Sequence, residues 1–178
     1  MRIFVLENDP QIYKFLELLA ESGHEIHHAK NLQNAAILLE FDPKIDYFDL
    51  LFFDVELPAE KVVHPDGMNT FIYTEEKNLN GLMYILNRID TLESLLTNVV
   101  VITAHKQRII DMSSIDVFGR EFKRMPLTEK QEKRRFERDQ VLKINYEAED
   151  NGKVYTLSFL DKGGDEIDTL IERFINRG

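Results

Sequence analysis

Polar side chains follow the apolar runs of this sequence at the points where strands are expected to end. Glu7, Asn8 and Asp9 follow the first run, and Asp54, Thr103 and Lys162 each end or follow a later one. The carboxyl ends of parallel strands meet at one edge of a sheet, so these side chains are expected to share one pocket. Carboxylate and amide oxygens suit a hard cation such as Mg²⁺, and a hydroxyl with an ammonium suits a phosphoryl group. The residue types therefore predict phosphoryl chemistry, and no combination supports a serine or cysteine triad.

The elements that would position these residues are short apolar runs. Ile3–Leu6, Leu50–Asp54 and Val99–Thr103 are typical of strands buried on both faces of a parallel sheet. Glu25–Ala29 and Val154–Leu160 are predicted as two further strands.

Helical periodicity separates these strands. Asp9 is expected to cap a helix with Pro10 at its first position, and Asn31 is expected to cap a second helix. A third helical stripe follows Asn80-Gly81, and a last helix is expected after Asp165. The apolar positions are Ile12, Phe15, Leu16 and Leu19 up to Gly23; Leu32, Ala35, Ala36 and Leu39; Leu82, Ile85, Leu86 and Ile89; and Ile167, Leu170, Ile171 and Phe174.

This alternation indicates an α/β fold, a doubly wound five-stranded parallel sheet with helices on both faces, in a single domain over residues 1–178. Two stretches, about 58–79 and 105–153, are insertions. The first is expected to be a long loop over the edge of the sheet where the polar residues gather.

The second insertion carries two signals. Residues 128–139 interleave acidic and basic side chains, which predicts a solvent-exposed helix rather than a nucleic-acid site. Asn151-Gly152 is a hairpin signal, so Val141–Tyr146 is predicted to add an antiparallel strand beside Val154–Leu160.

The composition narrows the classes of function. The chain has 178 residues, of which 32 are acidic and 22 basic, and a formal charge of −10. This balance argues against broad attraction to nucleic acid or to an anionic membrane. The absence of cysteine excludes disulfides, thiolate metal sites and a cysteine nucleophile, and it favours the cytoplasm. No leader is recognised at the start, and no apolar run approaches membrane-spanning length.

The order of these motifs resembles the receiver domains of two-component response regulators. The matching segments are Ile3–Pro10, Phe52–Pro58, Asn80–Leu82, Val101–His105 and Phe159–Lys162. The resemblance covers all five expected strands and most helices, and it omits the two insertions. It implies a flavodoxin-like sheet with the strand order 2-1-3-4-5, to which the hairpin strand is added.

The resemblance also implies a role for each site residue. Asp54 would accept a phosphoryl group from a histidine kinase or a phosphotransfer protein. Glu7 and Asn8 would hold Mg²⁺ together with Asp54 and the backbone carbonyl of Glu56. Enzymatic activity would extend at most to self-phosphorylation from a phosphodonor and autodephosphorylation.

Thr103 and Lys162 would contact the phosphoryl group, and their repositioning would be the switch. Three features depart from the family. Asn8 stands where a second Asp is usual, which should weaken Mg²⁺ binding. Gly163 replaces a usual proline, and the segment after Asp54 is much longer than normal. The second insertion also rebuilds the face through which receivers signal.

Three functions are compatible with these residues. The first is a stand-alone receiver-like signalling protein that acts through a downstream protein partner, with no DNA-binding output domain after the last helix. The second is a pseudo-receiver that binds its partner without phosphorylation. The third is a receiver-derived phosphoesterase for a cyclic phosphate, in which His64 of the long loop would reach the pocket.

The remaining histidines have simpler interpretations. His27 and His28 are neighbours on an expected strand and would face opposite sides, so the group that they form with His24 is interpreted as edge-strand residues. His64, without an evident partner, is interpreted as a surface residue, and His105 needs no special role.

Overall fold

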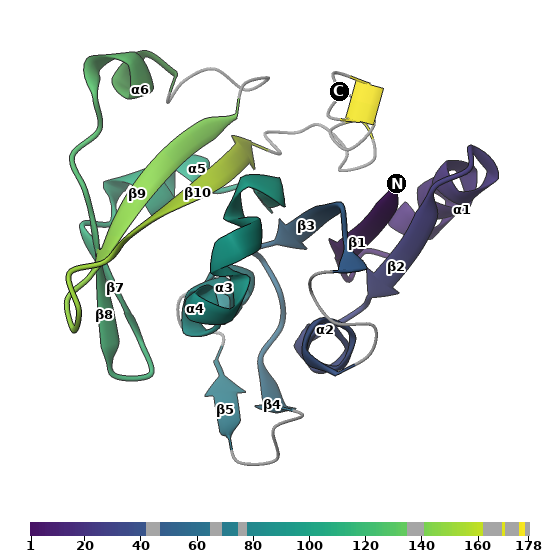
Figure 1. Cartoon of the computed structure of the whole chain (residues 1–178), viewed down its shortest axis with the longest axis horizontal. Coiled ribbons are helices and arrows are strands. Elements are labelled where there is room, and N and C mark those ends of the chain that lie inside the picture. The colour runs from purple at the N-terminus through teal and green to yellow at the C-terminus, as the bar shows by residue number, and fades with distance from the viewer. Residues whose placement is uncertain are drawn as a thin grey trace.

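The computed structural model describes residues 1–41, 47–64, 69–74, 78–134, 141–161, 169 and 175–176. An eight-stranded sheet with the order β2-β1-β3-β6-β10-β9-β8-β7 forms the centre of this part (Figure 1). Parallel pairing joins β2, β1, β3, β6 and β10 in that order, and antiparallel pairing joins β10, β9, β8 and β7. The predicted α/β fold with a mostly parallel sheet is confirmed. Its antiparallel part is larger than the one added strand that the sequence indicated.

The parallel strands are the apolar runs of the sequence. They are β1 (Arg2–Leu6), β2 (Glu25–Ala29), β3 (Leu50–Asp54), β6 (Val99–Thr103) and β10 (Val154–Asp161). Every residue of β3 and β6 is buried, whereas β2 at the edge is only partly buried. This is the burial expected of central strands that are covered on both faces.

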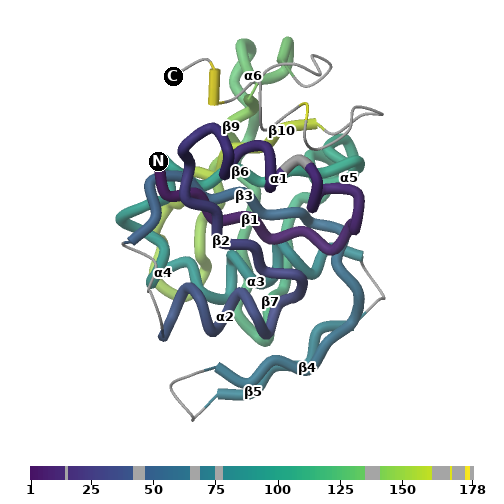
Figure 2. Tube along the Cα trace, turned by 90° about the vertical axis from the view of Figure 1, so that its right-hand side faces the viewer, coloured from purple at the N-terminus to yellow at the C-terminus, as the bar shows by residue number. Residues whose placement is uncertain are grey.

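Helices cover both faces of the sheet. On one face, α1 (Ile12–Glu21) packs apolar side chains against β1, β3 and β6. On the other face lie α2 (Leu32–Glu40), α3 (Asn80–Asn87) and α5 (Lys106–Asp111). Figure 2 shows α1 above the strands and α2 and α3 below them. The short helix α4 (Ile89–Leu92) and the 3₁₀ helix η2 (Glu93–Asn98) connect α3 to β6.

The starts of the first two helices show how the sequence sets their limits. Asn31 caps α2 as predicted, because its side-chain oxygen accepts a hydrogen bond from the N–H of Asn34 at 2.8 Å. α1 begins at Ile12, later than the predicted start at Pro10. The Asp9 carboxylate accepts from the N–H of Gln11 at 2.9 Å, so it closes a turn before the helix rather than capping it directly.

Residues 58–79 contain a β-hairpin, and the prediction of a loop over the sheet edge is wrong. β4 (Glu60–Val63) and β5 (Thr70–Tyr73) pair antiparallel and lie outside α2, as Figure 2 shows. The Glu60 carboxylate accepts hydrogen bonds from the first two N–H groups of α2, at 2.8 and 3.1 Å. The hairpin is therefore anchored to the start of that helix, where backbone donors lack partners within the helix.

The second insertion forms the antiparallel part of the sheet. β9 (Leu142–Ala148) pairs with β10, which confirms the predicted hairpin, whereas β7 (Ser114–Val117) and β8 (Arg120–Arg124) were not predicted. α6 (Glu129–Arg134) buries no residue, which confirms the solvent-exposed helix over the described part of 128–139. Most of the predicted last helix lies outside the described residues. No helix in the described part is long and apolar enough to cross a membrane.

Candidate functional site

Asp54 lies at the carboxyl end of β3, in the middle of the sheet. Asp54 is only 2% exposed to solvent. Leu6 pairs with Phe53, and Asp54 pairs with Ile102, so Glu7 and Thr103 follow directly on the two neighbouring strands. The sequence prediction that these polar residues meet at one sheet edge agrees with the strand register.

Thr103 is fully buried, and its hydroxyl makes two hydrogen bonds. The hydroxyl donates to the Glu56 carboxylate at 2.6 Å and accepts from the N–H of His105 at 2.8 Å. The family resemblance implied a role for Glu56 only through its backbone carbonyl, so this side-chain contact is an addition. A bond to a charged acceptor is stronger than a neutral one, so Glu56 holds the hydroxyl in its present orientation.

Glu7 and Asn8 differ in burial. Glu7 is 1% exposed, and its Oε1 accepts hydrogen bonds from the N–H groups of Asn8 and Asp9 at 2.9 and 3.0 Å. Asn8 is exposed. The two residues thus begin the loop after β1, in which the Glu7 carboxylate binds the backbone of the two residues that follow it.

His28 supports this loop from β2. Its Nε2 lies 2.7 Å from the carbonyl oxygen of Glu7, and because a carbonyl only accepts, the imidazole carries its proton on Nε2. Burial is the main cause that lowers the pKa of His28. The His28 ring packs edge-on against Tyr13, on the face of the sheet that α1 covers. His27 packs against Phe48, which belongs to the hydrophobic core on the opposite face of the sheet. The prediction that the two histidines face opposite sides is confirmed.

The start of α3 packs directly against the backbone of Asp54. A methyl group at Gly81 would lie 1.8 Å from the Asp54 carbonyl oxygen, so only glycine fits. The N–H of Gly81 donates to the Val55 carbonyl at 3.0 Å, and the buried Asn80 amide donates to the Leu57 carbonyl at 2.9 Å. The inserted hairpin therefore returns the chain to Asp54 and leaves the Asn-Gly contact in place.

Lys106 brings an ammonium group to the same edge and was not recognised in the sequence. It is only 2% exposed, and its Nζ lies 3.8 Å from Asp161 Oδ2. Asp161 pairs with Thr103 in the register of β6 and β10. A lysine is rarely buried without an anionic partner, so the pair fixes the end of β10. Lys162 follows this aspartate and lies outside the described residues.

His64 lies away from the site, which corrects both of its interpretations. It is fully buried, with Nδ1 2.7 Å from Glu40 Oε2 and its ring stacked on Tyr84. Glu40 is at the end of α2, whereas Glu60 binds the start of the same helix. β4 thus runs along α2, whose length is roughly 13 Å at 1.5 Å per residue. It leads away from the sheet edge that holds Asp54. His64 is neither a surface residue nor within reach of the pocket.

The described part of the site combines buried carboxylates, a hydroxyl and a buried ammonium. Among the described residues, no three His, Cys, Asp or Glu side chains are grouped as a metal site. The carboxylates of Glu7 and Asp54 nevertheless end neighbouring strands, and oxygen donors of this type are those that Mg²⁺ accepts.

A comparison with protein-family models gave no match, and a comparison with curated proteins gave none either. Several solved structures are weakly similar, among them two domains of response regulator proteins. The receiver domain of a Francisella response regulator is 16% identical with a TM-score of 0.39, over 58% of this chain and 66% of that one. The N-terminal domain of a response regulator/sensory box/GGDEF three-domain protein from Carboxydothermus hydrogenoformans is 19% identical with a TM-score of 0.38, over 59% and 66%. The chain thus spans less than two thirds of each of these domains.

Proposed function

We propose that the chain is a receiver-like signalling protein that accepts a phosphoryl group on Asp54. The observation that supports this most strongly is the placement of buried Asp54 at the end of the central strand β3, beside the neighbouring strand β6 that ends at Thr103. Gly81 allows α3 to pack directly on the Asp54 backbone at the sheet edge. The order of the parallel strands, β2-β1-β3-β6-β10, is the one that the resemblance implies.

The proposed reaction transfers a phosphoryl group from a histidine to a carboxylate. An oxygen of Asp54 attacks the phosphorus, a P–O bond forms and the N–P bond to the donor imidazole breaks, which yields an acyl phosphate. The donor would be a histidine kinase or a phosphotransfer protein. Lys162 would pair with the transferred group, as the resemblance implies, and Lys106 would hold the neighbouring strand end through Asp161.

A bound Mg²⁺ ion would neutralise charge on the phosphoryl oxygens. Glu7 and Asp54 would hold it with their carboxylates, Asn8 with its amide and Glu56 with its backbone carbonyl. The amide of Asn8 replaces a negative ligand by a neutral one, so we expect weaker Mg²⁺ affinity than an aspartate would give.

The hydrogen bond between Thr103 and Glu56 provides the proposed switch. A phosphoryl group on Asp54 would compete with Glu56 for the Thr103 hydroxyl, because both are anionic acceptors. Moving the hydroxyl to the phosphoryl group would release the Glu56 carboxylate. That change at the sheet edge would be communicated to a downstream protein partner.

Intact-mass measurement with Mg²⁺ and acetyl phosphate tests this proposal. We expect one labile phosphoryl adduct on the wild-type protein and none on Asp54→Ala. Adducts of equal amount on both proteins would show that Asp54 is not the acceptor.

One observation favours a second candidate, a pseudo-receiver that binds its partner without phosphorylation. Thr103 is already hydrogen-bonded to Glu56, an acidic side chain that occupies the acceptor role expected of the phosphoryl group. In that case neither Mg²⁺ binding nor an adduct would be found. The phosphoesterase alternative loses its main support, because His64 packs against Glu40 and no loop covers the site in the described part of 58–79.

A further inference from the structure

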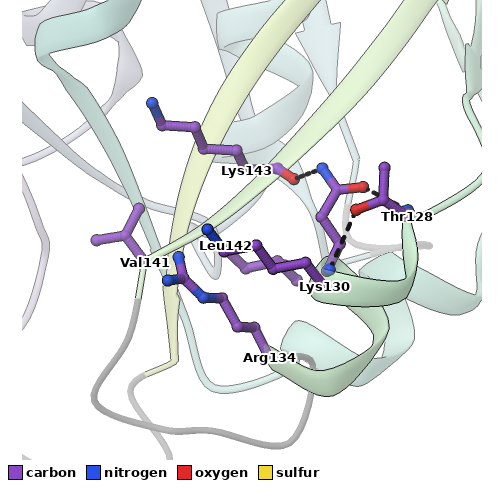
Figure 3. Close-up of a pocket in the computed structure, with 7 residues that line it drawn as sticks. Thr128, Lys130, Arg134, Val141, Leu142 and Lys143 are labelled. Carbon is purple, nitrogen blue, oxygen red and sulfur yellow. Dashed lines mark hydrogen bonds between the residues drawn. The ribbon is translucent and has the colours of Figure 1, made fainter.

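A cavity of about 440 Å³ lies between α6 and the start of β9. Its lining residues are Thr128, Lys130, Gln131, Arg134, Val141, Leu142 and Lys143. Figure 3 shows Lys130 and Arg134 extending from α6 over Leu142 toward Val141, while the ammonium of Lys143 points away from them. The charged groups of Lys130 and Arg134 thus lie over the apolar side chains of Val141 and Leu142. The described lining contains no carboxylate.

Hydrogen bonds fix α6 in this position. The side chain of Gln131 donates to the Lys143 carbonyl at 2.7 Å and accepts from the N–H of Thr128 at 2.7 Å. The Thr128 hydroxyl accepts from the N–H of Gln131 at 3.2 Å, which completes a capping box. The wall that carries the two cations is therefore tied to the sheet rather than free in solvent.

Lys130 and Arg134 differ from Lys133, their neighbour on α6, in having no ion-pair partner among the described residues. Lys133, on the same helix, lies 3.7 Å from Glu129, and Lys123 of β8 lies 2.6 Å from Glu149. Within the described residues, the side chains of Lys130 and Arg134 form neither an ion pair nor a hydrogen bond. This is unexpected in a chain with 32 acidic and 22 basic residues. Like charges four positions apart on a helix also repel each other.

We propose that this cavity binds a small phosphate-bearing anion between Lys130 and Arg134. A dianionic phosphate matches two cations, because the guanidinium offers paired donors and the ammonium acts as a point charge. The volume is in the range of small-molecule sites, and Val141 with Leu142 can accept an apolar part of the ligand. An anion there would also remove the repulsion along α6. The site is independent of phosphorylation at Asp54.

Titration calorimetry with inorganic pyrophosphate at low ionic strength tests the proposal. We expect saturable binding to the wild-type protein, and binding about tenfold weaker or more for Lys130→Gln and for Arg134→Gln. Lys133→Gln is the matched control on the same helix, and it should bind within about twofold of wild type.

Three results would overturn the proposal. They are no saturable binding up to about 1 mM pyrophosphate, an equal loss in Lys133→Gln, or wild-type binding by Lys130→Gln and Arg134→Gln. Circular dichroism of each variant checks that α6 and the fold are intact. Because Asp54→Ala should bind pyrophosphate normally, failure of this site and failure of phosphorylation can be told apart.

Discussion

At the scale of single residues, the Thr103 hydroxyl is the group for which Glu56 and the proposed phosphoryl group on Asp54 would compete. Glu56 holds it in the present structure at 2.6 Å. Replacing Glu56 by alanine should free the hydroxyl and remove a negative charge near Asp54. We expect phosphorylation by acetyl phosphate to become about threefold to tenfold faster, the range that a hydrogen bond of about 1 kcal/mol allows. The adduct is followed by intact mass against time.

Glu17→Ala is the control for that experiment, because Glu17 is an exposed carboxylate on α1. It should leave the rate unchanged. A rate in Glu56→Ala that equals or falls below wild type would contradict the competition between the two acceptors.

His28 makes the stability of the site loop depend on pH. Burial lowers its pKa in the folded protein, so below its ordinary pKa of 6.5 the unfolded chain binds more protons than the folded one. The free energy of unfolding should therefore rise with pH through this window and level off above about 6.5. In His28→Gln, whose amide can still donate to the Glu7 carbonyl, the rise should be smaller.

Urea denaturation of both proteins at several values of pH between about 5 and 8 measures this difference. Identical pH profiles for wild type and His28→Gln would show that His28 does not contribute.

Some site residues could be read from the sequence and others could not. Asp54 and Thr103 end continuous apolar runs, and strand ends of a parallel sheet meet at one edge, so their proximity followed from local pattern. Lys106 gives no such signal, because lysine at a helix start is ordinarily exposed and its burial depends on Asp161 of a distant strand. The same holds for His64, whose burial depends on Glu40.

At the scale of elements, the contact between α3 and β3 is the most constrained. Gly81→Ala should force the start of α3 away from Asp54, because the added methyl group meets a backbone oxygen at 1.8 Å. We expect the free energy of unfolding to fall by about 3 kcal/mol, at the upper end for an overpacked core. Chemical denaturation measures the change.

Gly119→Ala is a useful comparison for this prediction. Gly119 has a φ of +88° but no atom within 4 Å of an added methyl group, so it reports backbone strain alone. It should cost about 1 kcal/mol. If Gly81→Ala is no more destabilised than Gly119→Ala, the close approach to Asp54 does not limit this position.

The elements that were predicted and those that were missed differ in pattern. β3 and β6 are apolar at every position before their last residue, so their sequence alone identifies buried strands. β4 has one buried residue in four and β7 is equally short, so neither shows a period that exceeds chance. Their pairing depends on tertiary contacts such as the one between Glu60 and α2.

At the scale of the whole molecule, the two insertions contact each other. Phe118, in the turn between β7 and β8, packs against Phe71 and Tyr73 of β5 with ring centroids 4.7 and 5.1 Å apart. Phe118→Ala should lower the free energy of unfolding by about 1 to 2 kcal/mol, because the ring is partly exposed and two aromatic contacts are lost. Hydrogen exchange in β4 and β5 should become faster.

Phe41→Ala is the control, since Phe41 is 67% exposed. Its effect should stay within about 0.5 kcal/mol. Unchanged exchange in β4 and β5 of Phe118→Ala would show that the insertions are not coupled.

The central claim is that Asp54, among several acidic residues at one sheet edge, carries the phosphoryl group. Borohydride reduces an acyl phosphate to an alcohol, so it marks the modified carboxylate permanently. The decisive measurement is peptide mass spectrometry after treatment with acetyl phosphate, Mg²⁺ and borohydride. We expect the reduced residue at position 54 and nowhere else. A reduced residue at Glu7, Asp9 or Glu56, or none at all, would contradict the proposed function.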